Sequence, residues 1–348
     1  MEVVFCKEFI KIKILVIRLF CLAIFISTSF NGVAQLKRYT FIEPKMGSPF
    51  KIVIYCNDSM HAVHLAKQSF KLIDDYVNIF SDYIDSSEMM KLTSSAKIKS
   101  QPVKVSDELL ELLLKSKFAY EKSRGTFDIT IGPIVKLWRK ARKQQQFPAN
   151  NLVQKMRKLS GFDNILIDSI NKEITILKQG MQLDFGGIAQ GYIAQKVIDF
   201  LSDQQVTSAL VNASGDIVMS GAPPDNLGWT IGVNYPESEN EILQKTLLIK
   251  NKAVTTSGDA FQFMEHNGKK YSHIIDPRSG YGITSKKNVT VIANDGTTAD
   301  WLTKACTILS IKKAKKLAVQ LGAEVLITQI KKGKIIYYST KGFAQYWK

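Results

Sequence analysis

Hydrophobic and polar positions in the first half of the chain predict both strands and helices. Apolar residues fill positions 50–55 as in a buried strand, and they recur with helical spacing from about 60 to 80. A helix is expected at 107–122, because Ser106 is a good N-cap residue and two acids occupy the first turn. A third helical pattern runs through 188–200.

The second half is richer in strands. Short apolar runs bounded by turn residues predict strands near 208–220, 229–234, 246–249 and 289–293, helices through 300–321, and a closing hairpin of 325–328 with 335–338. These strands cluster as hairpins instead of alternating strictly with helices, so a doubly wound parallel sheet is disfavoured. The expected fold class is α+β, with mixed or antiparallel sheets flanked by helices.

Two regions of the chain differ in character. Residues 1–34 carry four cations before a short apolar run, and small residues end at Ala34, which is typical of a secretory signal peptide. The run is far shorter than the roughly 20 residues of a membrane span. Cys21 lies inside the run rather than after small residues, so we expect no lipoprotein anchor. Residues 35–348 show no linker or repeat, and we expect one compact, soluble periplasmic domain.

Charge and cysteine content indicate which partners the protein could bind and whether it contains a disulfide. The 348 residues carry a formal net charge of +16, which attracts anions. No nucleic-acid-binding motif accompanies the charge, so nucleic acid is not an expected partner. The basic segment 139–146 is expected to be a solvated helix end. Cys56 and Cys306 are expected to be buried thiols, with pairing to each other as the alternative.

The segment LDFGGIAQGYIAQ at 183–195 concentrates candidate ligand contacts. Apolar residues flank Asp184 as at the end of a strand, and Gly186 and Gly187 would let a ligand approach the backbone closely. Exposed N–H groups at the start of the following helix suit an anion. Taken alone, the glycines could equally serve the turn itself.

Other segments complete a set in a fixed order: MGSPFKIVIY from Met46, SDYIDSSEMMKL from Ser81, GTFDITIGPIVKLW from Gly125, TSGD from Thr256, HIIDPRSG from His273 and VTVIANDGTTAD from Val289. Together they resemble the FAD:protein FMN transferases of the ApbE type, from about residue 39 to the C-terminus. The resemblance implies that the protein binds FAD and passes its FMN half to a Thr or Ser hydroxyl of an acceptor protein.

The resemblance also implies the FAD site. Tyr83 is expected to stack on the isoalloxazine and Asp184 to contact the adenosine end, although a loop tyrosine by itself is more often a packing residue. Phe127 and Asp128 could equally be a core residue and a turn cap. The expected cofactor-binding set is Met46, Tyr83, Thr126, Phe127, Asp128, Asp184, Gln190, Ser257, Gly258, His273 and Ile275.

Transfer of FMN requires a base, because the attacking hydroxyl loses its proton while AMP leaves. The resemblance suggests His273, and a histidine titrates near neutrality and can accept this proton. Asp276 could orient His273 or act beside it. Alternatively, His273 could be a structural residue at a strand edge, with its hydrogen bonds made within the fold and no catalytic role. The segment TSGD at 256–259 has hydroxyl and glycine residues that suit phosphate oxygens, a composition that plain turns share.

The resemblance also implies magnesium. In relatives the ligands are a backbone carbonyl that matches Gly187, an Asp that matches Asp300, and a Thr four residues later, where this chain has Lys304. An ammonium cannot ligate a cation, and one helical turn from Asp300 it is placed to pair with the carboxylate. Either Lys304 replaces the charge of the metal, or the protein binds flavin without efficient transfer. Further departures from the family pattern occur at Gln190, Gln195 and Ser214.

The leading prediction is a periplasmic transferase that esterifies FMN onto an exported or membrane-bound electron-transfer protein. Association with a membrane redox complex is a further expectation. A non-catalytic FAD-binding protein and an FAD pyrophosphatase are the alternatives. Lys304 is the feature that would distinguish a non-catalytic FAD-binding protein from a transferase. A pyrophosphatase would differ from a transferase in the nucleophile that enters the site.

Overall fold

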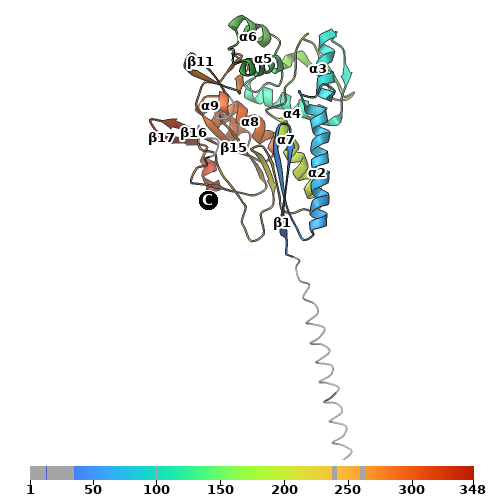
Figure 1. Ribbon diagram of the computed structural model, residues 1–348, viewed down its shortest axis with the longest axis vertical. Helices are drawn as coiled ribbons and strands as arrows, with labels where there is room; N and C mark the ends of the chain where they lie inside the picture. The colour runs from blue at the N-terminus through green and yellow to red at the C-terminus, as the bar shows by residue number, and fades with distance from the viewer. Residues whose placement is uncertain (1–12, 14–34, 99, 237–240, 259–262) are drawn as a thin grey trace, which may run out of the picture. The chain divides into compact units, whose positions relative to one another are not determined.

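Figure 1 shows the computed structural model, which describes residue 13 and residues 35–98, 100–236, 241–258 and 263–348. Apart from Lys13, the expected signal peptide lies outside the described residues and stays a prediction. Arg38–Lys348 forms one unit built around a central sheet.

The central sheet has eight strands, in the order β1 (Lys37–Lys45), β2 (Ser48–Cys56), β6 (Ala209–Ala213), β7 (Asp216–Ser220), β10 (Lys252–Ser257), β15 (Asn288–Ala293), β16 (Glu324–Lys331) and β17 (Lys334–Ser339). The described pairings from β2 to β17 are antiparallel; Val254, for example, faces Ile217 on one side and Ile292 on the other. The α+β prediction is therefore confirmed, including the closing hairpin.

Both faces of the sheet are buried between β2 and β16, which explains the nearly continuous apolar sequences of strands such as β2 and β15. Ile52 of β2 and Val291 of β15 face one apolar cluster, while the adjacent Val53 and Ile292 face the other. The second cluster is completed by side chains of β8 (Trp229–Ile231), β9 (Leu247–Ile249) and the 3-10 helix η2 (Lys341–Tyr346).

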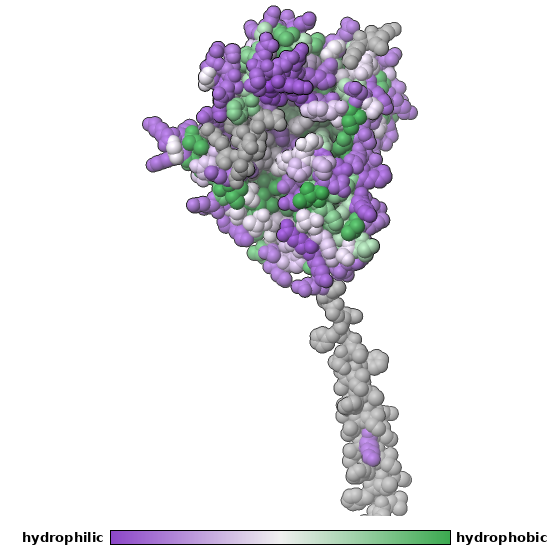
Figure 2. All heavy atoms as spheres, in the orientation of Figure 1, coloured by the Kyte–Doolittle hydropathy of each residue, from purple (hydrophilic) through white to green (hydrophobic). Residues whose placement is uncertain are grey.

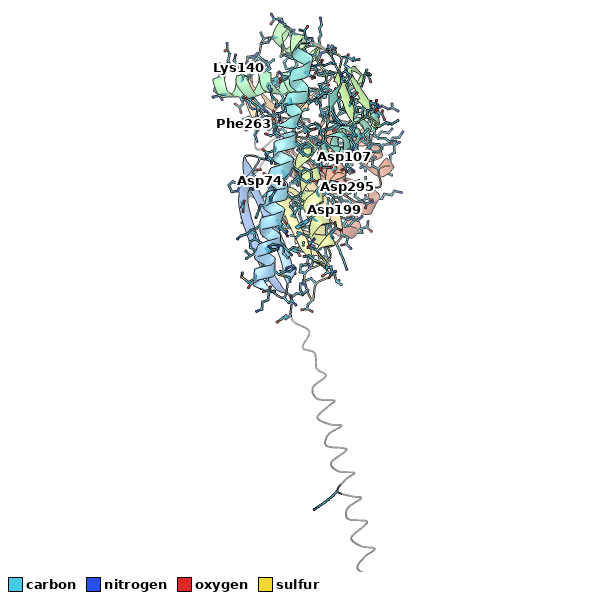
Figure 3. The ribbon with its side chains drawn as sticks, turned by 90° about the vertical axis from the view of Figure 1, so that its right-hand side faces the viewer. Asp74, Asp107, Lys140, Asp199, Phe263 and Asp295 are labelled. Carbon is cyan, nitrogen blue, oxygen red and sulfur yellow. The ribbon has the colours of Figure 1, made fainter. Side chains whose placement is uncertain are left out.

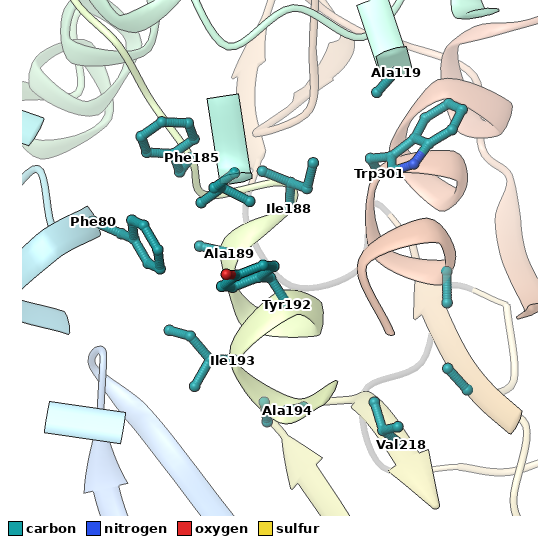
Figure 4. Close-up of a cluster of buried hydrophobic side chains, with 14 of the residues drawn as sticks. Phe80, Ala119, Phe185, Ile188, Ala189, Tyr192, Ile193, Ala194, Val218 and Trp301 are labelled. Carbon is teal, nitrogen blue, oxygen red and sulfur yellow. The ribbon is translucent and has the colours of Figure 1, made fainter. Parts of the chain in front are cut away.

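Helices cover the first face of the sheet: α2 (Ser59–Phe80), α7 (Ala189–Asp203), α8 (Gly296–Ile308) and α9 (Ile311–Gln320). Figure 4 shows α7 at the centre of this packing, with Tyr192 directed toward Phe80; their ring centroids lie 5.6 Å apart. Cys56 of β2 and Cys306 of α8 are free, buried thiols, and burial raises the pKa of both.

Helices α7 and α8 cross closely because both carry glycine at the contact. A Cβ on Gly191 would lie 2.1 Å from the carbonyl oxygen of Gly296, and a Cβ on Gly296 would lie 2.3 Å from that of Gly191. Any larger residue would push the helices apart. The crossing brings Asp300 to the first turn of α7, where its Oδ2 accepts a hydrogen bond from Gly191 N at 3.0 Å. Asp300 thus satisfies an N–H group that has no partner within its own helix.

The remaining elements surround one end of the sheet. The helices are α3 (Glu88–Ile98), α4 (Asp107–Ser123), α5 (Gly132–Gln144), α6 (Asn150–Arg157) and η1 (Phe162–Asn164); the strands are β3 (Val103–Lys104), β4 (Ile165–Asp168), β5 (Glu173–Ile176), β11 (Phe263–His266), β12 (Lys269–Ser272), β13 (Ile275–Asp276) and β14 (Tyr281–Gly282). Hydrophilic residues gather over α5 and α6 in Figure 2. Within the described residues, no helix has the length and apolar character needed to cross a membrane.

Candidate active site

A cavity of about 210 Å³ opens where four loops meet the C-terminal half of α8. The loops follow α2, precede α5, precede α7 and follow β12. This volume is below the roughly 300–1,000 Å³ of pockets that enclose a whole drug-sized ligand, so a dinucleotide would extend beyond it. The cavity is lined by many of the residues expected from the sequence: Tyr83, Thr126, Phe127, Asp128, Asp184, Gly187, His273, Ile275 and Lys304.

The loop between α4 and α5 supplies Thr126, Phe127 and Asp128, all of which are buried. Asp128 Oδ1 accepts hydrogen bonds from the backbone N–H and the hydroxyl of Thr130, at 2.8 and 2.7 Å. Burial raises the pKa of the Asp128 carboxyl. The Phe127 ring packs 6.0 Å from that of Trp301 and also lines the cavity. Phe127 and Asp128 therefore stabilise the fold as well as forming part of the cavity wall.

Asp184 lies beside this loop, in the segment before α7, and its backbone N–H donates to the carbonyl oxygen of Ile129 at 2.8 Å. We expected it at the end of a strand, but only an isolated bridge between Gln182 and Ile131 precedes it. The strand does not form because Asp184 Oδ1 accepts a hydrogen bond from Gly186 N at 2.7 Å and so turns the chain toward α7. Burial raises the pKa of the Asp184 carboxyl, against the opposing effect of Arg139.

Arg139 of α5 joins three residues at the cavity. Its guanidinium pairs with the carboxylates of Asp82 and Asp184, the latter at 3.0 Å, and lies 4.7 Å from the centroid of the Tyr83 ring. The Tyr83 side chain is 78% exposed, so this ring presents an open aromatic face. The prediction of a solvated helix end is wrong for Arg139, because two carboxylates compensate its partial burial, whereas the adjacent Lys140 is exposed (Figure 3).

One face of α5 points into the cavity. Ile131, Val135, Arg139 and Arg142 all line it, and their spacing of four, four and three residues places them on one side of a helix. Within the described part of the chain, no ion pair involves Arg142. Burial, together with the charge of Arg139, lowers the pKa of Arg142. Neither arginine was predicted as a site residue from the sequence, although their helical spacing was a usable signal.

The segment after β12 contributes His273, Ile274, Ile275 and Pro277 to the cavity wall. His273 is half-buried and lies at a bend rather than in a strand. Asp276 does not line the cavity; its carboxylate accepts two hydrogen bonds from the Arg278 guanidinium, at 2.8 and 2.7 Å. This bidentate contact raises the pKa of Arg278 and fixes the turn beside His273.

Lys304 of α8 forms the base of the cavity with two carboxylates behind it. Its Nζ lies 2.5 Å from Asp300 Oδ1 and 3.9 Å from Asp216 Oδ1. Burial raises the pKa of Asp216 to about 7, and the neighbouring Asp300 carboxylate adds to the rise. A Cβ on Gly187 would lie 3.1 Å from the Phe127 ring and 3.4 Å from Lys304 Cγ, so a glycine at this position leaves room for both side chains.

These residues do not fit magnesium. The two oxygens of Asp300 are engaged by Gly191 N and by the Lys304 ammonium. The ammonium would repel a divalent ion about 4 Å away by several kcal/mol at a partly buried site. Within the described residues, no group of three or more His, Cys, Asp or Glu side chains is placed to hold a metal.

Four further residues of the expected site lie outside the cavity wall. Met46 lies at the turn between β1 and β2, with a φ of 52°. Gln190 of α7 donates a hydrogen bond from Nε2 to Oγ of Ser48, a residue of this hairpin, at 3.4 Å. Ser257 is buried at the end of β10. Gly258 follows it, and a Cβ there would lie 2.4 Å from Asn288 Oδ1. Their expected contacts with FAD stay predictions.

The fold and the site define an α+β protein with a cation-lined cavity beside an open aromatic ring. Residues 46–327 match the model of the ApbE family, and the chain belongs to this family. A FAD:protein FMN transferase of Klebsiella pneumoniae (strain 342) is 32% identical over 276 residues, which cover 79% of this chain and 84% of that protein. One of Treponema pallidum (strain Nichols) is 29% identical, with 82% and 83% covered.

A solved structure has the same fold. The apo form of the flavinyl transferase ApbE of Pseudomonas stutzeri superposes with a TM-score of 0.80 at 27% identity, covering 90% of this chain and 98% of that one. The family assignment made from the motifs is therefore confirmed.

Proposed function

We propose that this chain is an FAD:protein FMN transferase, which joins the FMN half of FAD by a phosphoester bond to a Thr or Ser of an acceptor protein. The observation that carries the proposal is the cavity, which gathers Tyr83, Asp184, His273 and Lys304 from distant parts of the chain. Membership of the ApbE family and the activity named for its relatives support it.

The site residues divide the work of binding and transfer. Tyr83 offers its exposed ring to the isoalloxazine, and Asp184, which also lines the cavity, contacts the adenosine end. The acceptor oxygen attacks the phosphorus next to FMN, the bond from that phosphorus to the AMP phosphate breaks, and AMP leaves. His273, on the cavity wall, takes the proton of the hydroxyl.

Lys304 supplies fixed positive charge for this step. Phosphoryl transfer spreads negative charge over the phosphate oxygens, and preorganised cations in a site of low dielectric stabilise it. The Lys304 side chain is 20% exposed, so its ammonium is held by Asp300 yet still borders the cavity. The Arg142 guanidinium adds a further positive charge to the cavity wall. Within the described residues, it forms no ion pair with a carboxylate.

The acceptor is proposed to be an exported or membrane-bound electron-transfer protein that meets this chain in the periplasm after removal of residues 1–34. The support is the sequence pattern of those residues. A membrane redox complex that contains such an acceptor is the proposed setting.

One incubation tests the activity. Purified chain 35–348 is mixed with FAD and a candidate acceptor, with and without magnesium, while AMP, free FMN and covalent flavin are measured. AMP together with covalent flavin supports the transferase. AMP and free FMN without covalent flavin would indicate a pyrophosphatase, and tight FAD binding without AMP release would indicate a carrier.

A further inference from the structure

A second cleft, of about 370 Å³, adjoins the cavity and is strongly basic. Two observations show that the two spaces are neighbours. Thr126 lines both of them, and Pro277 and Ile308 line the cavity while the next residues in the chain, Arg278 and Leu309, line the cleft. The described lining includes five cations and no Asp or Glu: Lys122, Ser123, Arg124, Thr126, Arg278, Leu309, Lys313, Lys316, Leu317 and Gln320.

Two helices bring these cations together. Helix α9 buries Ala314, Leu317 and Ala318 against the body. Its lysines Lys312, Lys313 and Lys316 are exposed, and Lys315 is half-buried. Lys313 and Lys316, three residues apart, share the side that borders the cleft. The C-terminal end of α4 supplies Lys122 and the following Arg124.

Most of this charge is not compensated within the protein. Arg278 pairs with Asp276, and the Lys122 ammonium lies over the Phe118 ring at 5.3 Å. Within the described residues, none of the other cations of the cleft forms an ion pair. Like charges gathered in this way repel one another, and a bound polyanion would relieve the repulsion.

We propose that this basic cleft binds an acidic segment of the acceptor polypeptide, next to the residue that receives FMN. The inference rests on the proposed function, since a transferase must admit a polypeptide hydroxyl to the cavity that holds FAD. A chain lying in the cleft reaches the cavity across Thr126. Complementary charge would orient that chain and speed its encounter with the protein.

The test compares two double variants of one helix. Lys313→Glu with Lys316→Glu reverses two charges in the cleft, whereas Lys312→Glu with Lys315→Glu makes the same charge change on α9 outside the cleft lining. The probe is a short fluorescein-labelled peptide with one Thr flanked by Asp and Glu; its partner carries Asn and Gln instead. Binding is measured by anisotropy without FAD, so the result does not depend on catalysis.

The cleft variant should bind the acidic peptide about tenfold more weakly than wild type. The affinity of the control variant should change little, because charges at exposed positions interact only over short distances. The Asn and Gln peptide should bind weakly to all three proteins. FAD affinity, titrated separately, should be the same throughout. The proposal is overturned if both double variants lose affinity equally, if the neutral peptide binds as well, or if a single-stranded oligonucleotide binds the cleft while the acidic peptide does not. A failure of transfer with normal peptide binding would count against the proposed activity instead.

Discussion

Lys304 Nζ lies 2.5 Å from Asp300 Oδ1, one turn apart on α8, so an ammonium stands beside the carboxylate that relatives are expected to use for a metal. The adjacent Thr303 does not offer a substitute ligand, because its hydroxyl is buried and donates to the carbonyl oxygen of Ala299 at 2.5 Å. We therefore propose that Lys304 supplies, as a charge attached to the fold, the positive charge that a metal ion would otherwise bring to this site.

FAD binding and transfer by the wild-type protein are expected to be insensitive to EDTA. Lys304→Thr should create a magnesium-dependent site, since a hydroxyl beside Asp300 can ligate the ion that the ammonium repels. Calorimetric titration with magnesium and the rate of covalent flavin formation measure both effects. Lys304→Met is the matched control: it removes the charge without adding an oxygen ligand, so magnesium should not restore its activity. Stoichiometric magnesium binding by the wild type, with activity lost in EDTA, would refute the replacement.

Tyr83 is expected to contribute to FAD affinity through its open ring face. Tyr83→Ala should weaken FAD binding by about 1–3 kcal/mol through lost stacking and burial, whereas Tyr83→Phe should cost little. Tyr337→Ala is a suitable control, because this tyrosine is also exposed but lies on β17, outside the cavity lining. Fluorescence titration of FAD measures the change. Wild-type affinity in Tyr83→Ala would remove this residue from the site.

The raised pKa of Asp216 predicts how stability depends on pH. The folded protein holds this proton up to about pH 7, whereas an unfolded chain releases it near pH 4. The contribution to stability is therefore complete below about pH 4 and is lost as the pH rises through about 7. Asp216→Asn cannot titrate, so its free energy of unfolding should fall less across this range. Urea denaturation of both proteins at several pH values measures the difference; parallel pH profiles would contradict the assignment.

The period-two and helical patterns predicted β2, β6, β7, β15, β16 and β17 of the central sheet and α2, α4, α7, α8 and α9, because most of those elements bury long apolar faces. They did not predict β1, whose exposed alternation is weak, β10 in the middle of the sheet, whose sequence KAVTTS is half polar, or the short strands β11 to β14. Such strands gain their stability from neighbours rather than from their own composition.

The motifs likewise located most of the cavity wall, but they did not predict three charged residues of the site, Arg139, Arg142 and Asp216. Arg139 sits in a basic run that has the composition of a solvated helix, and its role depends on Asp82 and Asp184, which lie 57 and 45 residues away. The burial of Asp216 follows from the packing of α8 on β7 and β10. Contacts of this kind depend on the tertiary structure and have no local sequence signal.

Export predicts a defined N-terminus. If residues 1–34 are a signal peptide, the protein recovered from cells should begin at Gln35 and be found in the periplasmic fraction, because the small-residue cleavage site ends at Ala34. Intact-mass spectrometry of the recovered protein measures this. A chain that keeps Met1, or one with a lipid on cysteine, would show that the assignment is wrong.

The roles of His273 and Asp276 can be separated by their different positions. His273 lines the cavity, so His273→Asn should lower the rate of FMN transfer by about 10²–10⁴-fold, the usual contribution of a general base, while FAD affinity stays near that of wild type. Asp276 is bound to Arg278 outside the cavity lining, so Asp276→Asn should act through the turn and lower the rate less. Arg278→Gln breaks the same contact from the other side and should reproduce the Asp276→Asn effect. Single-turnover measurement of AMP release, with saturating FAD and acceptor, compares the three variants. If His273→Asn transfers FMN at the wild-type rate, or if Asp276→Asn alone abolishes transfer while Arg278→Gln does not, then Asp276 rather than His273 accepts the proton.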